Sequence, residues 1–221
     1  MKMGKTYFNP GCALTIHKPE AEVALLKLLR DKYDGNVELH SLCCHHDPQV
    51  EKGSCIVVVC AGCDRRFNKL YEGISTLTLW EVLDGVEGIQ YPDYKGRKMS
   101  LHDPCPIRSK PQVHRAARSL LKKMNIEVVE AALHAASSRC CGDSYYPDLP
   151  LEEIHARMKE RAASMPCDEV AVYCVTCVRS MHFGGKKPRY LVDLLLGEET
   201  VPPEGDVPEW HARIKEYRER H

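Results

Sequence analysis

Residues 56–63 read Ile-Val-Val-Val-Cys-Ala-Gly-Cys, and residues 169–177 read Glu-Val-Ala-Val-Tyr-Cys-Val-Thr-Cys. In each stretch a short run rich in β-branched residues leads into a C-x-x-C motif. Runs of this kind are typical of strands that are buried on both faces of a parallel sheet. The two stretches therefore predict two buried parallel strands, each ending at a pair of cysteines.

The C-x-x-C motifs belong to a longer cysteine pattern that occurs twice. Each copy has a single cysteine, a vicinal pair and then the C-x-x-C. The first copy is Cys12, Cys43, Cys44, Cys60 and Cys63, and the second is Cys105, Cys140, Cys141, Cys174 and Cys177. Equivalent positions are 93, 97 and 114 residues apart, so the second copy gains 17 residues after its vicinal pair. The pattern indicates an internal duplication.

Each half also has the same order of predicted elements. A strand precedes the first cysteine, an amphipathic helix follows it, and two further strands come next. In chain order these are 5–8, 21–29, 37–42 and 56–60, and then 98–102, 113–124, 126–130 and 169–174. The 17 extra residues of the second half predict a helix over Leu151–Met165 that the first half lacks.

The predicted fold class is α/β, with two duplicated β-α-β lobes related by pseudo-twofold symmetry. We place the first, shortened lobe at residues 1–90 and the second at residues 96–200, with a linker between them. A C-terminal tail with a mixed-charge helix occupies residues 201–221. Because open α/β sheets bind ligands beyond the carboxyl ends of their strands, the cysteines of each lobe are expected to converge there. Cys55 and Cys167, which precede strands, are expected to lie outside both groups.

Composition and charge exclude several classes of function. The 221 residues contain 31 Lys and Arg against 31 Asp and Glu, so no basic excess favours binding to nucleic acid. No stretch approaches the roughly 18 apolar residues of a membrane span, and the first ten residues lack the apolar core of a signal peptide. We therefore expect a cytoplasmic protein. In that reducing compartment, 12 cysteines point to metal binding or electron transfer rather than to disulfides.

The number of cysteines in each copy indicates the kind of metal site. A tetrahedral zinc ion and a cubane iron–sulfur cluster each take four ligands. Each copy has five cysteines, so one thiol of each copy would not be used as a ligand. Side chains of adjacent residues diverge, so a vicinal pair suits a multinuclear cluster better than one ion. The pattern therefore favours an iron–sulfur cluster.

Four short motifs surround the cysteines. They are Asn9-Pro10-Gly11-Cys12, His102-Asp103-Pro104-Cys105, Arg139-Cys140-Cys141-Gly142 and Cys174-Val175-Thr176-Cys177. Together they resemble the duplicated cysteine-rich CCG domain of heterodisulfide reductase, which occurs in the B subunit of that enzyme and in its relatives, lactate-utilisation and glycolate oxidase iron–sulfur proteins among them. The resemblance implies that the five cysteines of a motif hold a non-cubane [4Fe-4S] cluster, with one thiolate bridging irons, and that a disulfide is reduced there.

The two halves fit this resemblance unequally. The second half fits well, which assigns a cluster to Cys105, Cys140, Cys141, Cys174 and Cys177. In the first half only 15 residues separate Cys44 from Cys60, and His45-His46 stands where the family usually has glycine. Cys12, Cys43, Cys44, Cys60 and Cys63 are therefore expected to hold a second cluster or a zinc ion, or to be empty.

The resulting hypothesis is an oxidoreductase subunit that passes electrons to a small disulfide or thiol substrate at the second cluster site. His102 is the candidate catalytic residue, as a hydrogen-bond donor to sulfur or a proton donor to a leaving thiolate. Because the chain has no G-x-G-x-x-G fingerprint, electrons are expected from another subunit. A ferredoxin-like iron–sulfur subunit is the expected partner, and a flavoprotein subunit is a further candidate.

Three alternatives remain open. The first is a non-catalytic zinc- or cluster-binding scaffold of a larger redox complex. The second is a thioredoxin-like dithiol protein, and the third is a protein with duplicated buried structural cysteines.

Overall fold

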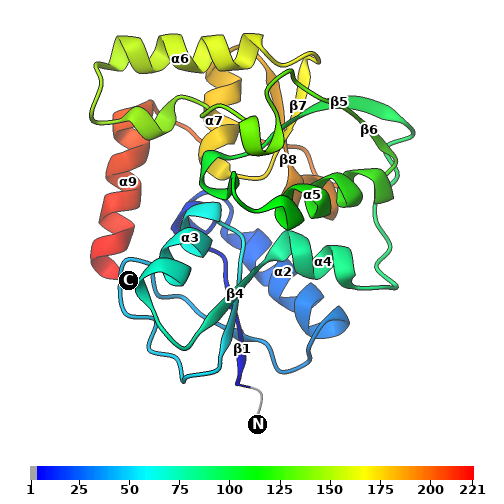
Figure 1. Cartoon of the computed structure of the whole chain (residues 1–221), viewed down its shortest axis with the longest axis vertical. Coiled ribbons are helices and arrows are strands. Elements are labelled where there is room, and N and C mark those ends of the chain that lie inside the picture. The colour runs from blue at the N-terminus through cyan, green and yellow to red at the C-terminus, as the bar shows by residue number, and fades with distance from the viewer. Residues whose placement is uncertain (1–3) are drawn as a thin grey trace. The chain divides into compact units, whose positions relative to one another are not determined.

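The computed structural model describes residues 4–221, and the chain divides into two compact units (Figure 1). The first unit consists of the chain up to Ile89 together with Ala212–His221, and the second is Gln90–His211. The division falls within the last helix, α9 (Val207–Arg220).

The first unit is built on a parallel sheet of four strands. In chain order they are β1 (Thr6–Asn9), β2 (Glu38–Leu39), β3 (Cys55–Val58) and β4 (Ser75–Thr78), and their order in the sheet is β2-β1-β3-β4. Phe8 of the central strand β1 pairs with Leu39 of β2 and Val57 of β3. The helices are α1 (Cys12–His17), α2 (Pro19–Lys32), α3 (Ala61–Leu70) and α4 (Leu79–Gly85).

The second unit repeats this plan. Its parallel sheet has the order β6-β5-β7-β8, formed by β5 (Arg97–His102), β6 (Ile126–Val129), β7 (Glu169–Val172) and β8 (Lys187–Tyr190). Its α-helices are α5 (Pro111–Lys123), α6 (Leu151–Ala163), α7 (Val175–Phe183) and α8 (Leu191–Leu196), with short 3₁₀ helices at Cys105–Ile107, Ala135–Ser137 and Asp143–Tyr145. The equal strand orders confirm the predicted α/β class with duplicated β-α-β lobes. The twofold relation between the lobes stays a prediction.

Local sequence explains why these elements form. Ile56, Val57 and Val58 of β3 are fully buried, as expected for a strand covered on both faces. Pro19 and Pro111 begin α2 and α5, where a missing backbone N–H costs nothing.

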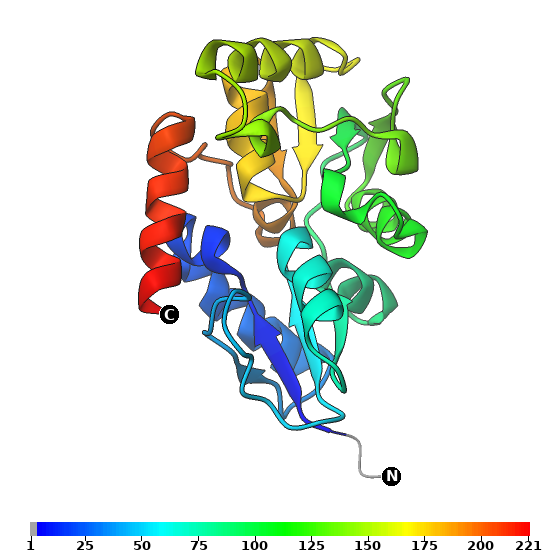
Figure 2. The ribbon, with the colours of Figure 1, turned by 60° about the vertical axis from the view of Figure 1, so that its left-hand side comes forward.

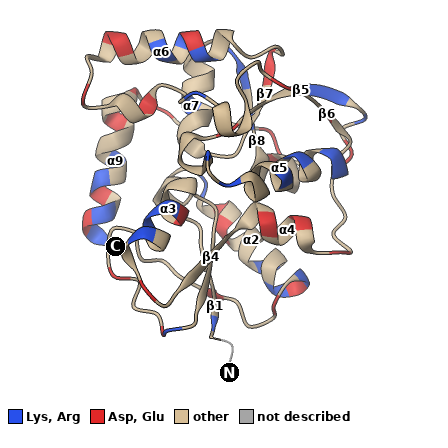
Figure 3. Cartoon of the chain, in the orientation of Figure 1, with Lys and Arg blue, Asp and Glu red and all other residues tan. Residues whose placement is uncertain are grey.

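The helix predicted in the second half is present as α6, and it packs against α7 (Figure 2). No helix lies between Cys44 and β3 in the first unit. Basic and acidic residues alternate along α6 and α9 (Figure 3). The α-helices described over residues 4–221 have at most 14 residues, too few to cross a membrane.

Candidate metal centres

The cysteines lie where the strand order of each sheet changes direction. In the first unit the chain leaves β1 for β2 on one side, and then crosses to β3 and β4 on the other. Ligands of open α/β sheets bind at such a switch point. Cys12 follows β1 and Cys60 follows β3, so both flank this point, and Cys105 after β5 and Cys174 after β7 do the same in the second unit.

Within each unit the five predicted thiols form one continuous series. Neighbouring members of the series are within hydrogen-bonding reach of each other. The order is Cys12, Cys43, Cys44, Cys63 and Cys60 in the first unit, and Cys105, Cys140, Cys141, Cys177 and Cys174 in the second. The two series match position for position, so the structure brings together the residues that the sequence grouped.

The two remaining cysteines lie elsewhere. Cys55 is the first residue of β3, and its thiol interacts with Ser75. Cys167 precedes β7, and its backbone N–H donates to Ser100 Oγ at 2.8 Å. Cys55 therefore lies at the amino end of its strand and Cys167 just before the amino end of its own, away from the ends that carry the thiol series.

The first cysteine of each vicinal pair has a thiol whose pKa is strongly lowered. Hydrogen bonds from the thiols of Cys12 and Cys44 lower the pKa of Cys43 to about 2. The thiols of Cys105 and Cys141 likewise lower the pKa of Cys140, and Ser144 Oγ lies 2.8 Å from its sulfur. Negative charge is thus stabilised at the same sulfur in both units, as a metal ligand requires.

The two series differ in how far they are open to a cavity. Four thiols of the first unit, those of Cys12, Cys44, Cys60 and Cys63, line a cavity of about 580 Å³ that His45 also lines. In the second unit a cavity of about 350 Å³ has only Cys140 of its five thiols in the lining.

Helix α6 packs directly on the chain beside the second vicinal pair. Gly142 has a φ of 108°, and a Cβ added there would lie 2.7 Å from Met158 Cγ and 2.9 Å from the backbone nitrogen of Met158. Only glycine combines this backbone conformation with such a close approach.

Gly142→Ala is therefore expected to destabilise the second unit and to reduce its iron content. The matched control is Gly185→Ala, because Gly185 also has a positive φ (88°) but nothing lies within 4 Å of its added Cβ. The difference between the two variants isolates the overlap with Met158, which we expect to cost about 1–3 kcal/mol of unfolding free energy. Thermal unfolding and iron analysis measure it, and equal loss in both variants would argue against the packing described.

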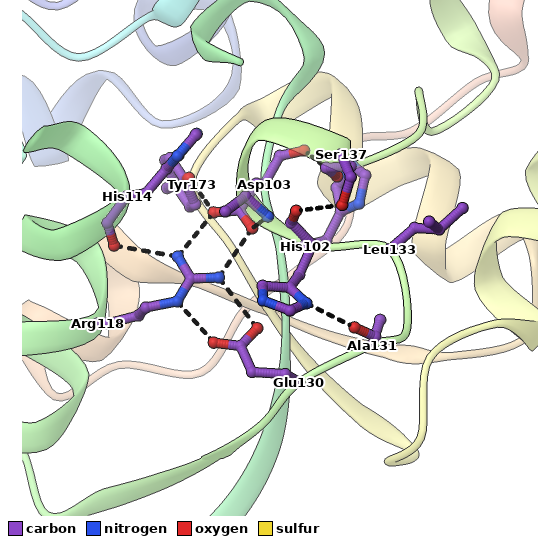
Figure 4. A network of polar contacts seen from close by, with 12 residues as sticks. His102, Asp103, His114, Arg118, Glu130, Ala131, Leu133, Ser137 and Tyr173 are labelled. Atoms are coloured by element: carbon purple, nitrogen blue, oxygen red, sulfur yellow. Dashed lines mark hydrogen bonds and ion pairs between the residues drawn. The ribbon is translucent and has the colours of Figure 1, made fainter. Parts of the chain in front are cut away.

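A buried carboxylate joins the chain segments that carry the second thiol series (Figure 4). Asp103 is 0% exposed and accepts hydrogen bonds from Arg118 at 3.0 and 2.9 Å, from Tyr173 Oη at 2.5 Å and from the backbone N–H of Ala135 at 2.7 Å. Arg118 also contacts Glu130 at 2.6 and 3.0 Å. Burial alone raises the pKa of Asp103, but hydrogen bonds and charge from Arg118 outweigh it and lower the pKa below its ordinary value.

These contacts reach all three segments. Asp103 lies two residues before Cys105, Tyr173 immediately precedes Cys174, and Ala135 belongs to the loop that leads to Cys140. Asp103 is therefore a positioning residue for the series.

A second buried contact, between Arg161 and His102, lies beside the buried thiols of Cys141 and Cys177. Arg161 Nε donates to His102 Nδ1 at 3.2 Å, and His102 is fully buried. Burial, and then the charge of Arg161, lower the pKa of His102 to about 3, so the imidazole is neutral. Because Nδ1 accepts, the ring proton must reside on Nε2. Nε2 has no hydrogen-bond partner among the nitrogen and oxygen atoms of the described residues.

The same imidazole is close to sulfur. One of its nitrogens and the sulfurs of Cys141 and Cys177 all lie within 4.8 Å of one another. Since Arg161 occupies Nδ1, Nε2–H is the donor left for these sulfurs.

Arg161 itself is a buried charge without a carboxylate partner in the described part of the chain. It is 4% exposed, and its acceptors are neutral: His102, the hydroxyls of Ser138 and Ser164, and the Leu133 carbonyl. Burial lowers its pKa, whereas Asp103 and the thiols of Cys177 and Cys141 act in the opposite direction. A buried cation needs nearby negative charge, which these groups supply.

The first unit holds its vicinal pair differently. Asn9 takes the place of His102, and its amide donates to His40 Nδ1 at 2.8 Å and to the carbonyls of His40 and Leu42 at 3.0 and 2.9 Å. Pro10 takes the place of Asp103. The end of α9 also contributes, because the His221 carbonyl accepts from the backbone N–H of Cys43 at 3.1 Å.

Sequence reasoning missed Asp103, Arg118, Tyr173 and Arg161. Of these four residues, only Arg161 could have been recognised from the sequence. It lies three residues after Met158 and seven after Ile154, on the apolar face of a predicted helix, where a charged residue needs a reason.

No protein-family model matches the chain. An uncharacterized iron–sulfur protein of Methanocaldococcus jannaschii is 30% identical over 91 residues, which are 40% of this chain and 17% of that protein. The B subunit of fumarate reductase (CoM/CoB) from Methanothermobacter marburgensis is 24% identical over 201 residues, 77% of this chain and 40% of that protein. This chain thus spans less than half the length of both relatives.

Among solved structures, aspartate racemase of Picrophilus torridus aligns with 97% of this chain and 98% of its own at a TM-score of 0.35 and 12% identity, too low a likeness to carry an argument. The two sequence relatives carry more weight. The chain is similar to iron–sulfur proteins, one of them a component of a reductase, and this similarity together with the clustered cysteines supports an iron–sulfur cluster.

Proposed function

We propose that this chain is the component of an iron–sulfur oxidoreductase, of the same type as the B subunit of heterodisulfide reductase, at which a small disulfide is reduced. The observation that carries the proposal is the series of five interacting thiols at the switch point of each sheet. Membership of the CCG family belongs to this proposal.

The residues of the second unit fit a non-cubane [4Fe-4S] cluster. Cys105, Cys140, Cys141, Cys174 and Cys177 would hold it, and five thiols exceed the four that zinc or a cubane takes. A buried arginine without a carboxylate partner and an imidazole N–H near two sulfurs both suit a negatively charged group at this place.

When bound, the cluster supplies electrons to the substrate. The overall reaction takes two electrons and two protons, breaks the S–S bond and releases two thiols. Cys140 is the thiol that lines the cavity, so the substrate approaches on that side. The His102 N–H binds sulfur, and Arg161 holds the ring in the tautomer that can do so.

The electrons are proposed to come from an iron–sulfur electron-transfer subunit, with a flavoprotein subunit as the other candidate, because one relative is itself one subunit of a reductase. A cytoplasmic location is part of this proposal, because cysteines that bind metal need a reducing compartment.

For the first unit we propose an accessory site, held by Cys12, Cys43, Cys44, Cys60 and Cys63. Four thiols and His45 line its cavity, a nitrogen and sulfur donor set that zinc also takes. This observation favours the second candidate function, a zinc- or cluster-binding scaffold within a larger complex.

The proposal is tested by anaerobic reduction of three small disulfides: dithiodipropionate, hydroxyethyl disulfide and cystamine. Dithionite-reduced methyl viologen is the electron donor, and its oxidation is followed by absorbance. Iron-loaded protein is expected to reduce at least one disulfide, consuming two viologen equivalents for each. Equal activity of iron-free protein would show dithiol chemistry instead, and the absence of turnover with all three would reject the proposed function.

Replacing His102 is expected to lower the reduction potential of the second site. His102→Phe removes a hydrogen bond to anionic sulfur, worth about 1–2 kcal/mol, or roughly 50–100 mV for one electron. His102→Gln keeps an N–H donor and should recover part of this shift. The potential is measured by titration monitored with electron paramagnetic resonance. An unchanged potential in an iron-loaded His102→Phe protein would show that the histidine is only structural.

A further inference from the structure

The cavity beside Cys140 is lined mainly by cations. It has a volume of about 350 Å³, within the range of sites for small molecules. Four arginines line it, Arg108, Arg139, Arg157 and Arg161, against a single carboxylate, that of Glu160.

Two of these guanidinium groups have no carboxylate partner among residues 4–221. Arg161 binds only neutral acceptors, as described above. Arg108 is exposed, and its Nε donates to the Ser138 carbonyl at 2.7 Å, which leaves its terminal nitrogens for a ligand.

The other two have exposed partners. Arg139 contacts Glu160 at 3.1 Å, and both side chains are about two-thirds exposed. Arg157 lies 4.6 Å from the ring centre of Tyr145 and contacts Glu153 at 2.7 Å. Exposed ion pairs of this kind are weak and exchange readily, so both guanidinium groups remain available to an anion.

We propose that this cavity binds an anionic head group, a carboxylate or a phosphate, of the disulfide that is reduced beside Cys140. The inference rests on the proposed function, and it adds the charge of the substrate. Guanidinium groups bind both kinds of anion through paired N–H donors. A head group held by Arg108 and Arg157 leaves the remainder of a small molecule in the same cavity as the Cys140 sulfur.

Charge balance with the thiols does not account for Arg108, Arg139 and Arg157. Four of the five thiols of the second unit lie outside the cavity lining. In the first unit the cavity is also basic, with Arg65, Arg66, Lys69 and Arg218, but there four thiols share the lining, and as metal ligands they would supply the opposite charge. The surplus of cations over thiols is therefore specific to the cavity at Cys140.

Binding is measured by calorimetry on the iron-loaded, oxidised protein without reductant, so that no turnover is needed. The probes are dithiodipropionate, inorganic phosphate, neutral hydroxyethyl disulfide and cationic cystamine. We expect at least one anionic probe to bind about tenfold or more tightly than the neutral and cationic ones, and the better anion identifies the head group. The Arg108→Gln/Arg157→Gln double variant should weaken that binding by about tenfold or more.

The matched control is Arg115→Gln, which removes one exposed positive charge from α5 outside the cavity and should change the affinity by less than about twofold. Equal affinity for all four probes, or no effect of the double variant, would overturn the inference.

Failure of the proposed function is distinguishable from failure of the inference. If the anion binds as expected but no disulfide is reduced with viologen as donor, the site exists and the proposed reaction is wrong. If disulfides are reduced with equal kcat/KM whatever their charge, the reaction stands and the anion site is wrong.

Discussion

Replacing both Cys140 and Cys141 with serine is expected to abolish disulfide reduction and to remove the redox-active iron. These residues are the second and third members of a five-thiol series, so their loss separates Cys105 from Cys174 and Cys177. A serine hydroxyl does not ionise in the range in which a thiol does, and it does not replace a thiolate ligand. Electron paramagnetic resonance and the viologen assay measure the two losses.

The matched variant is Cys43→Ser/Cys44→Ser, which makes the same change in the first unit. We expect it to retain the redox signal and the activity, because the first unit lacks α6, the Asp103 contacts and the pair formed by His102 and Arg161. Loss of the signal in the first-unit variant alone would reverse the proposed assignment of the two sites.

Asp103→Asn is expected to destabilise the second unit by about 3–5 kcal/mol, since it removes one partner of a buried ion pair. The carboxylate is fully buried and Arg118 is 24% exposed, so solvent screens the pair little. The amide keeps one acceptor oxygen, which is not enough for the contacts with Arg118, Tyr173 and Ala135. The loops that carry the thiols lose their common anchor, and iron content should fall with stability.

Scanning calorimetry and iron analysis measure this change. The control is Asp93→Asn, at an exposed aspartate of the same unit that binds Asn125 at 2.8 Å, and its Tm should stay close to that of the unchanged protein. Equal Tm values for the two variants would mean that Asp103 does not anchor the site.

The duplicated layout was predictable because its determinants are local. Apolar β-branched runs, the first-turn prolines and the helical repeat of α6 each lie within one short segment. The strand β8 was not predicted, because Lys187-Pro188-Arg189-Tyr190 contains a proline. Pro188 is tolerated since β8 is at the edge of its sheet. Helices α3 and α7 were not predicted either. Each begins inside a C-x-x-C motif, and these motifs were interpreted as metal-binding segments.

The grouping of the thiols was predictable for a similar reason. Each cysteine is close in sequence to a strand end, and parallel strands bring those ends together. The contacts that position the thiols were not predictable, because they join residues distant in sequence. Arg161 and His102 are 59 residues apart, and Tyr173 and Asp103 are 70 apart. The hydrophobic periodicity of a single segment contains no information about contacts between residues so far apart.

Iron, acid-labile sulfide and zinc, measured together on the anaerobically purified chain, test the central claim most directly. A cluster on the five thiols of the second unit predicts at least about four iron and four sulfide ions per chain. The Cys140→Ser/Cys141→Ser variant should contain about four fewer of each. Zinc without labile sulfide in the unchanged protein, or iron and sulfide unaltered in that variant, would contradict the account.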